Sequence, residues 1–289
     1  MKRFFTIFSF LFVAIQAFSQ PKKTAQSNNS KPFVLGVVEE LQSKQLAEKR
    51  VLNIYLPEGY SPNDTVRYPV IYLLDGSANE DFIHVVGLVQ FNNFSWINQV
   101  PKSIVVGIAN TDRRRDFTYP TTIEEDKKRF PTTGKSSHFI SFIETELQPF
   151  IEQKYKTTAS KTLIGQSLGG LLATEILFKK PLLFTNYIII SPSLWWDNGS
   201  LLNENPAVLQ KDFAQKTAIY IGVGKEGLAP SSTPHVMEVD ANLLVDKLKA
   251  IKNKSLTIHF DYLPQEDHAT ITHQAVFNAF RLLYPVPGK

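Results

Sequence analysis

The chain of 289 residues contains no cysteine. This absence excludes disulfides, thiolate metal sites, a cysteine nucleophile and lipid attachment to an N-terminal cysteine. The His-Glu-x-x-His spacing of zinc hydrolases is also missing, so we expect no metal. Glycines at 222, 224 and 227 have the spacing of the Gly-x-Gly-x-x-Gly motif of dinucleotide-binding proteins, but turn residues follow them where that motif requires a helix. We therefore expect no dinucleotide and no other cofactor.

Blocks of like charge are missing as well. The formal net charge is +4, and basic and acidic residues are interspersed along the chain. Such a distribution is typical of a solvated surface rather than of a nucleic-acid-binding face. We therefore expect no nucleic-acid partner.

Long apolar runs are scarce, and the one that stands out lies near the N-terminus. Lys2 and Arg3 precede an apolar run over residues 4–17, and small residues occupy the −3 and −1 positions of a cleavage after Ser19. This is the pattern of a signal peptide over residues 1–19. We expect export to the periplasm or the medium, with no stable membrane span after cleavage; an uncleaved membrane anchor is the alternative.

Residues 20–31 are polar and show no periodicity, which predicts a flexible linker. The remainder, residues 32–289, shows no second linker and no internal repeat. With 43% hydrophobic residues in the whole chain, this length suffices for one large domain with a substantial core.

Short apolar runs alternate with amphipathic stretches through that domain, which predicts strands alternating with helices. Expected strands cover 33–40, 49–56, 68–74, 103–109, 161–164, 187–190, 218–224 and 256–260. Expected helices cover 139–150, 240–251 and 275–283, and another begins directly after Ser167. Buried strands interleaved with helices favour a mostly parallel sheet covered on both faces. The predicted fold class is therefore α/β.

The most informative stretch is Gly165-Gln166-Ser167-Leu168-Gly169. It follows an apolar run and precedes a helical pattern, as in the nucleophile elbow of α/β-hydrolases. This context favours Ser167 as a nucleophile over a simple helix N-cap serine. The predicted fold is accordingly the α/β-hydrolase fold.

A serine nucleophile needs a base, and in this fold the histidine comes last in the chain. His268 follows the last predicted strand and is our candidate base. His259 lies inside that strand, where a structural role is expected. His273 falls where the last helix begins and is the second choice.

The acid should end the preceding strand, where Glu226 lies. An exposed loop glutamate is the ordinary alternative. Three aspartates compete for the role because they follow other strands or open the next helix: Asp197, Asp240 and Asp261.

Two backbone N–H groups should stabilise the oxyanion. We expect them from Leu168, directly after the nucleophile, and from Ser77 in the loop after an early strand, with Gly76 as the second choice for that loop. Trp195 and Trp196 follow another strand and are candidate substrate-lining residues, although core packing is the expected role for at least one of them.

The segment from 110 to 135 shows no clear period and is expected to be a long irregular loop that forms a wall of the site. It contains Arg113, Arg114 and Arg115, and His138 follows it. These side chains are candidates for contact with an acidic substrate, but a solvated surface position is the favoured interpretation.

Taken together, the motifs resemble the Putative esterase family of α/β-hydrolases, which includes siderophore esterases, esterase D-like enzymes, feruloyl esterases and mycolyltransferases. The matching stretches are Val70–Gly76, Arg115–Thr118, Leu163–Leu171, Ser191–Trp196 and Asp267–Ala269, so the resemblance covers nearly all of the chain after residue 32. It implies Ser167 as nucleophile, His268 as base, and Ser77 and Leu168 as oxyanion donors. Asp267 departs from the pattern, since a glycine often precedes this histidine.

These observations predict an exported serine hydrolase that cleaves a small-molecule carboxylic ester. Acyl transfer to an alcohol or sugar uses the same residues and stays open. A catalytically silent binding module has no need of a serine, acid and histidine in this order. A peptidase is disfavoured because no large lid or propeller domain accompanies the fold. Oligomeric state and the ester itself are not encoded in any motif.

Overall fold

The computed structural model describes residues 30–63 and 65–285. The expected signal peptide (1–19) and most of the expected linker (20–31) lie outside the described residues. Residues 30–34 belong to a separate unit, and the chain from Leu35 onward forms one compact unit, whose structure is given below.

Within the described part, the strands of this unit form one eight-stranded sheet in the order β1-β2-β4-β3-β5-β6-β7-β8. The strands are β1 (Val37–Ser43), β2 (Glu48–Tyr55), β3 (Tyr68–Leu73), β4 (Ile104–Ile108), β5 (Thr157–Gln166), β6 (Asn186–Ile190), β7 (Thr217–Gly224) and β8 (Leu256–Leu263). β1 and β2 are antiparallel, and β2 pairs antiparallel with β4. From β4 to β8 all pairs are parallel, which confirms the predicted mostly parallel sheet.

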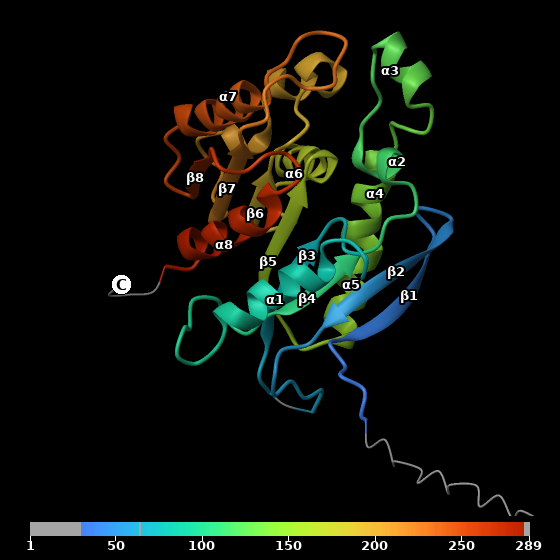
Figure 1. Cartoon of the computed structure of the whole chain (residues 1–289), viewed down its shortest axis with the longest axis vertical. Helices are drawn as coiled ribbons and strands as arrows, with labels where there is room; N and C mark the ends of the chain where they lie inside the picture. Colours follow the sequence, from blue (N-terminus) through green and yellow to red (C-terminus); the bar gives the residue numbers. More distant parts are fainter. Residues whose placement is uncertain (1–29, 64, 286–289) are drawn as a thin grey trace, which may run out of the picture. The chain divides into compact units, whose positions relative to one another are not determined.

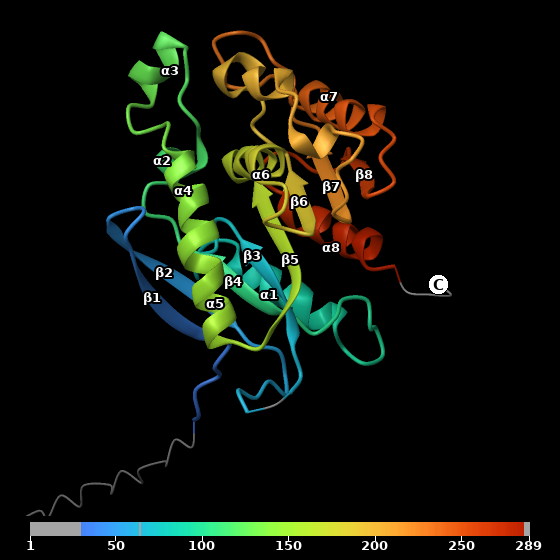
Figure 2. The same ribbon diagram turned by 180° about the vertical axis from the view of Figure 1, so that it is seen from behind.

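The helices cover both faces of this sheet. They are α1 (Phe82–Asn92), α2 (Arg113–Phe117), α3 (Glu124–Arg129), α4 (Ser136–Phe142), the π-helical turn η1 (Ile143–Leu147), α5 (Gln148–Lys154), α6 (Leu168–Lys179), the 3-10 segments η2 (Trp196–Asn203) and η3 (Ala207–Leu209), α7 (Met237–Ala250) and α8 (Ile271–Leu283). Apolar residues of α1 and α8 form the core on one face, in front of the sheet in Figure 1. Apolar residues of α4, α5, α6 and α7 form the larger core on the other face, which is turned towards the viewer in Figure 2.

Burial explains why the central strands are apolar without alternation. All five residues of β4 are buried, as are the last four of β6. A strand covered on both faces is stabilised by an apolar side chain at every position.

Because the strands from β4 to β8 are parallel, their carboxyl ends lie at one edge of the sheet. The loops that follow them meet at this edge, where the candidate site lies.

Two expectations need correction. Residues 110–135 are not a wholly irregular loop, because α2 and α3 lie within them. α1 was not expected, although Val85, Val86 and Val89 give it a buried face. α2 and α3 are short, and α1 lacks strong amphipathic periodicity, so tertiary packing decides the conformation of all three helices.

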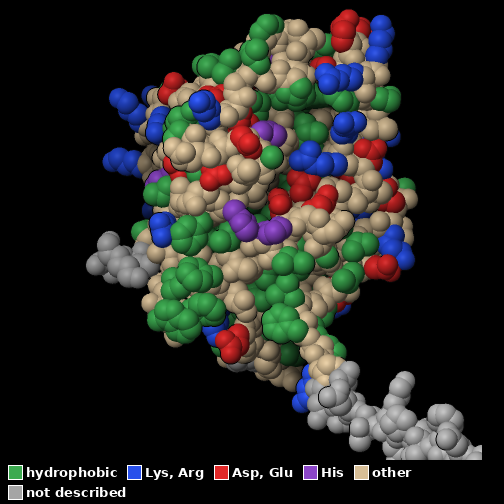
Figure 3. All heavy atoms as spheres, viewed as in Figure 1, with side chains coloured by type: hydrophobic (Ala, Val, Ile, Leu, Met, Phe, Trp, Pro, Cys, Tyr) green, Lys and Arg blue, Asp and Glu red, His purple; other side chains and the backbone are tan. Residues whose placement is uncertain are grey.

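The surface is mixed in charge. Figure 3 shows basic and acidic side chains interspersed over the face that carries α1 and α8, with hydrophobic side chains gathered beside α1. In α1 and directly after it, the exposed large hydrophobic side chains include Ile83, Phe91 and Trp96. Among the described residues, no helix has both the length and the apolar character needed to cross a bilayer.

Candidate active site

Ser167 lies in a sharp turn between β5 and α6. Its backbone angles are φ 60° and ψ −121°, in a region that residues with side chains rarely adopt. Glycine is required at position 165 because the turn is so tight that a side chain there would come within 2.4 Å of the Gly169 carbonyl oxygen. The strained turn projects the serine at the end of β5, next to the first turn of α6, whose N–H groups lack helical partners.

His268 lies beside this serine. Its Nε2 is 3.0 Å from Ser167 Oγ, and its Nδ1 is 2.5 Å from Glu226 Oε2. The three side chains come from the loops or turns after β5, β7 and β8, separated by up to 101 residues in the chain. A serine hydroxyl, an imidazole and a carboxylate in this chain of hydrogen bonds can activate the hydroxyl as a nucleophile.

Glu226 is held in a buried, polar environment. Its side chain is 2% exposed, and it accepts hydrogen bonds from the Ser191 hydroxyl and, at 3.1 Å, from the Gly224 N–H. Burial alone would raise the pKa of Glu226, but the hydrogen bonds from His268 and Ser191 outweigh it and hold that pKa below its usual value. Glu226 therefore stays ionised at neutral pH, as an acid that stabilises an imidazolium must.

The competing acids lie elsewhere. Asp197 accepts hydrogen bonds from Thr121 and Thr122. Asp240 contacts His235, and Asp261 accepts from Tyr220 and Asn278. Each of these carboxylates is engaged with side chains outside the Ser167 site.

The other two histidines considered as bases also lie elsewhere. His259 is within β8, and its Nε2 is buried without a hydrogen-bond partner. His273 is in the first turn of α8, where its ring packs edge-on against that of His84 at 4.9 Å.

One positioning residue was not anticipated. The side-chain amide of Gln166 donates to the His268 backbone carbonyl oxygen at 2.8 Å, and the Gln166 backbone carbonyl oxygen accepts from Arg113 Nη2 at 3.2 Å. Gln166 thus joins the serine turn to the loop that carries the histidine. Its position directly before Ser167 was the only available signal, because the partner lies 102 residues away.

The predicted oxyanion donors differ in their surroundings. Leu168 opens α6 and lines the cavity next to Ser167. The Ser77 N–H donates to Glu80 Oε2 at 3.3 Å, and Ser77 does not line either cavity that contains Ser167. The role of Ser77 therefore stays a prediction, and it requires the Glu80 carboxylate to release this amide.

Two cavities of about 270 Å³ each meet at Ser167. The first, here called the arginine chamber, is lined by Arg113, Arg114, Arg129, Phe130, Leu168 and Trp196 among others. The second, here called the histidine chamber, is lined by Glu226, Leu228, Ala229, Met237 and His268. Both are bordered by Ser167, Ser193, Trp195 and Pro230.

Both candidate tryptophans line the arginine chamber, and Trp195 also lines the histidine chamber. Trp196 is 1% exposed, and its indole N–H donates to the Tyr119 carbonyl at 2.8 Å. Trp196 is therefore mainly a core residue that also lines the arginine chamber, while Trp195 borders both chambers.

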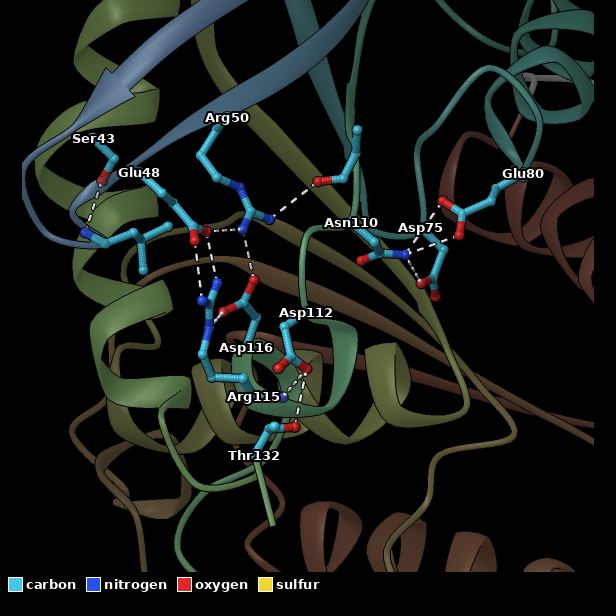
Figure 4. A network of polar contacts seen from close by, with 12 residues as sticks. Ser43, Glu48, Arg50, Asp75, Glu80, Asn110, Asp112, Arg115, Asp116 and Thr132 are labelled. Atoms are coloured by element: carbon cyan, nitrogen blue, oxygen red, sulfur yellow. Dashed lines mark hydrogen bonds and ion pairs between the residues drawn. The ribbon is translucent and has the colours of Figure 1, made fainter. Parts of the chain in front are cut away.

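The three consecutive arginines are not simply solvated, and this corrects the favoured interpretation. Arg113 contacts both carboxylate oxygens of Asp75, at 2.6 and 2.9 Å. Arg115 pairs with Glu48 and Asp116, which also bind the fully buried Arg50. Figure 4 shows this group, with Asp75, Glu80 and Asn110 forming a second group nearby.

Of these three arginines, only Arg114 is exposed and forms no ion pair with the described residues. Its guanidinium lies 4.6 Å from the ring centre of Phe130, at the arginine chamber. His138, by contrast, borders a small cavity beside Arg115 and Asp116. Within the described residues, no cluster of three or more His, Asp or Glu side chains has metal-binding geometry.

Comparison with known proteins gives a consistent result. The model of the family described as Putative esterase matches residues 43–268. The chain is 27% identical over 282 residues to the ferri-bacillibactin esterase BesA of Bacillus subtilis (strain 168), covering 92% of this chain and 96% of that protein.

Two solved structures are similar over most of their length. An IroE-like serine hydrolase from Shewanella oneidensis shares 34% identity with a TM-score of 0.76, covering 86% of this chain and 80% of that chain. The BES protein from Bacillus cereus shares 29% identity with a TM-score of 0.77, covering 91% of this chain and all of that chain (100%).

Proposed function

The chain belongs to the Putative esterase family and is a carboxylic ester hydrolase with the α/β-hydrolase fold, and from this premise we propose that it is an exported serine esterase working through an acyl-enzyme. The observation that carries the mechanism is the hydrogen-bonded series Ser167–His268–Glu226. Neither a fold nor a binding role requires these three side chains to align.

In the proposed first step, Ser167 Oγ attacks the ester carbonyl carbon while its proton passes to His268 Nε2. The carbonyl oxygen becomes an oxyanion at the Leu168 N–H, with the Ser77 N–H as the expected second donor. Collapse of this intermediate expels the alcohol, which takes the proton from His268. Water then attacks the acyl-enzyme by the same route, releasing the acid and restoring the serine. Glu226 stabilises the imidazolium in both halves.

Labelling with a fluorophosphonate probe and hydrolysis of p-nitrophenyl acetate test this mechanism. Ser167→Ala should abolish labelling and lower kcat by about 1000-fold or more. The matched control is Ser160→Ala, near the beginning of β5, which should keep both the labelling and the wild-type kcat. Wild-type hydrolysis by Ser167→Ala would refute the proposed nucleophile, and a wild-type protein that neither labels nor hydrolyses esters would favour a silent binding module.

We propose an iron-chelating siderophore ester as the substrate. The support is the ferri-bacillibactin esterase, which matches this chain along nearly its whole length. A hydrolysis panel of a siderophore ester, a feruloyl sugar ester and a simple acyl ester tests the class. We expect the highest kcat/KM for the siderophore, and a preference for either other ester would reject it. Adding a sugar acceptor distinguishes acyl transfer, because a transferase would yield a new ester instead of the free acid.

Export is proposed from residues 1–19, which lie outside the described residues. Expression of the full chain in a bacterial host should give a mature protein that begins at Gln20 and is recovered outside the cytoplasm. Mass spectrometry of the intact N-terminus and cell fractionation measure both. A chain that keeps residues 1–19 and stays with the membrane would instead support an uncleaved anchor.

A further inference from the structure

The two chambers at Ser167 differ in chemistry although they are equal in size. Beyond their shared border, the arginine chamber has cationic and aromatic walls. The histidine chamber has the small or apolar side chains of Leu228, Ala229 and Met237 together with the Glu226 carboxylate. An ester also has two unlike parts, and the position of the base determines which part enters which chamber.

The alcohol part must lie on the His268 side. During collapse of the tetrahedral intermediate, the leaving oxygen takes its proton from His268 Nε2, so it must be within hydrogen-bond reach of that atom. His268 lines the histidine chamber and not the arginine chamber. With the oxyanion at the Leu168 N–H, the remaining substituent of the carbonyl carbon is the acyl part, and the arginine chamber is the space left for it.

The charge of the arginine chamber is not fully compensated. Arg113 is neutralised by Asp75. Arg114 and Arg129 are exposed and form no ion pair among the described residues. Arg129 does influence a nearby carboxylate: burial raises the pKa of Asp126, and the charge of Arg129 partly offsets this rise. Their guanidiniums lie 4.6 and 4.9 Å from the centre of the Phe130 ring.

Arg129 also reaches across the border of the site. Its Nη1 donates to the Pro230 carbonyl oxygen at 3.2 Å, joining the end of α3 to the loop that borders both chambers. A guanidinium has five donors, so this contact leaves others for a ligand. Two guanidiniums beside an aromatic ring suit a planar acyl group that bears an anionic substituent.

We propose that the two chambers that meet at Ser167 receive different parts of the substrate: the arginine chamber receives the acyl part and selects an anionic, aromatic acyl group through Arg114 and Arg129, while the histidine chamber receives an uncharged alcohol part. The inference rests on the serine mechanism proposed above. It also implies that a negative charge on the alcohol part is disfavoured, because Glu226 faces that chamber as a carboxylate.

Two matched pairs of aromatic esters test this assignment. In the first pair the charge is on the acyl part: 4-nitrophenyl 4-carboxybenzoate against its neutral methyl ester. In the second it is on the alcohol part: 4-carboxyphenyl benzoate against its methyl ester. We expect kcat/KM to favour the charged member of the first pair by about tenfold, with the preference reduced at high salt, and the neutral member of the second pair.

Arg114→Gln/Arg129→Gln should remove the acyl-charge preference, and Arg114→Lys/Arg129→Lys should retain part of it, because lysine keeps the charge but loses the planar fork. Arg281→Gln is the matched control, since Arg281 also lies over a phenylalanine ring, at 4.3 Å, but lines neither chamber. It should leave all four rates unchanged. Thermal unfolding of each variant checks that the fold is kept.

The outcomes separate the two proposals. Hydrolysis of the neutral esters without an acyl-charge preference, a preference for charge on the alcohol part, or an acyl-charge preference that survives Arg114→Gln/Arg129→Gln would each overturn the chamber assignment while leaving the serine mechanism intact. A wild-type protein that hydrolyses none of the four esters and is not labelled by the fluorophosphonate probe would overturn the serine mechanism and the assignment with it.

Discussion

Two histidines in this molecule lie in similar settings with different consequences. His268 Nδ1 contacts the buried carboxylate of Glu226 at 2.5 Å, and His235 Nδ1 contacts the buried carboxylate of Asp240 at 3.0 Å. The difference is at Nε2. The Nε2 atom of His268 lies 3.0 Å from the Ser167 hydroxyl oxygen, whereas the Nε2 atom of His235 lies 3.2 Å from Asn198 Oδ1.

The atom at Nε2 therefore distinguishes the two roles. A hydroxyl can give its proton to the ring and become a nucleophile, and an amide oxygen cannot. His235 instead joins the start of α7 to the η2 segment, and a side chain at Gly199 would come within 3.1 Å of its ring. A histidine paired with a buried carboxylate is thus insufficient evidence for catalysis, because the same pair also serves as a brace between elements.

The largest expected difference between the two histidines is in kcat, when each imidazole ring is removed in turn. His268→Gln should lower kcat by about 1000-fold or more, because no base then accepts the serine proton. His235→Gln should change kcat by no more than about threefold, since no reacting atom touches His235. Steady-state hydrolysis of p-nitrophenyl acetate measures both, and similar losses in the two variants would contradict the distinction.

A smaller effect is expected from the carboxylates. Glu226→Gln should lower kcat by about 100-fold or more, because an amide neither stabilises the imidazolium nor fixes the ring tautomer. Asp240→Asn should act on the fold, lowering the free energy of unfolding by about 1–3 kcal/mol through the weakened contact to His235. Urea unfolding together with ester hydrolysis separates the two, and an Asp240→Asn enzyme that is stable but inactive would refute the brace.

The smallest effect is a dependence of stability on pH. Because the folded pKa of Glu226 is lowered, its ionised form stabilises the fold above the unfolded pKa of about 4.3. This contribution is lost as pH falls through the lowered folded pKa. The difference in Tm between the wild type and Glu226→Gln should therefore shift against the wild type as pH falls below about 4. A difference that stays constant between pH 3 and 7 would contradict it.

The three central residues of the candidate site could be predicted from the sequence, and the reason is physical. Parallel strands end at one edge of a sheet, so the loops after β5, β7 and β8 must meet there, and Ser167, Glu226 and His268 follow from their places in the chain. The nucleophile turn also has a local signature, since its glycines leave room for close backbone contact. The mostly parallel pairing was also predictable, because buried apolar strands alternate with helices along the chain.

The supporting contacts were not predictable. Gln166, Ser191 and Arg113 act through partners between 35 and 102 residues away, and a single polar side chain carries no periodic signal. α2 and α3 span only five and six residues, too short for a hydrophobic period to emerge. Packing, rather than local preference, gives these residues their partners.

The run Arg113-Arg114-Arg115 has a consequence for how this segment tolerates change. Successive residues of a helix point about 100° apart, so the three guanidiniums face Asp75, the arginine chamber and the Glu48–Asp116 group respectively. The three residues are chemically identical, but each guanidinium contacts different side chains, so none can substitute for a neighbour. Deleting or inserting one residue here would leave the composition nearly unchanged while giving every arginine the wrong partner. We therefore expect natural length variation to fall outside α2, where a shift of one residue has no such cost.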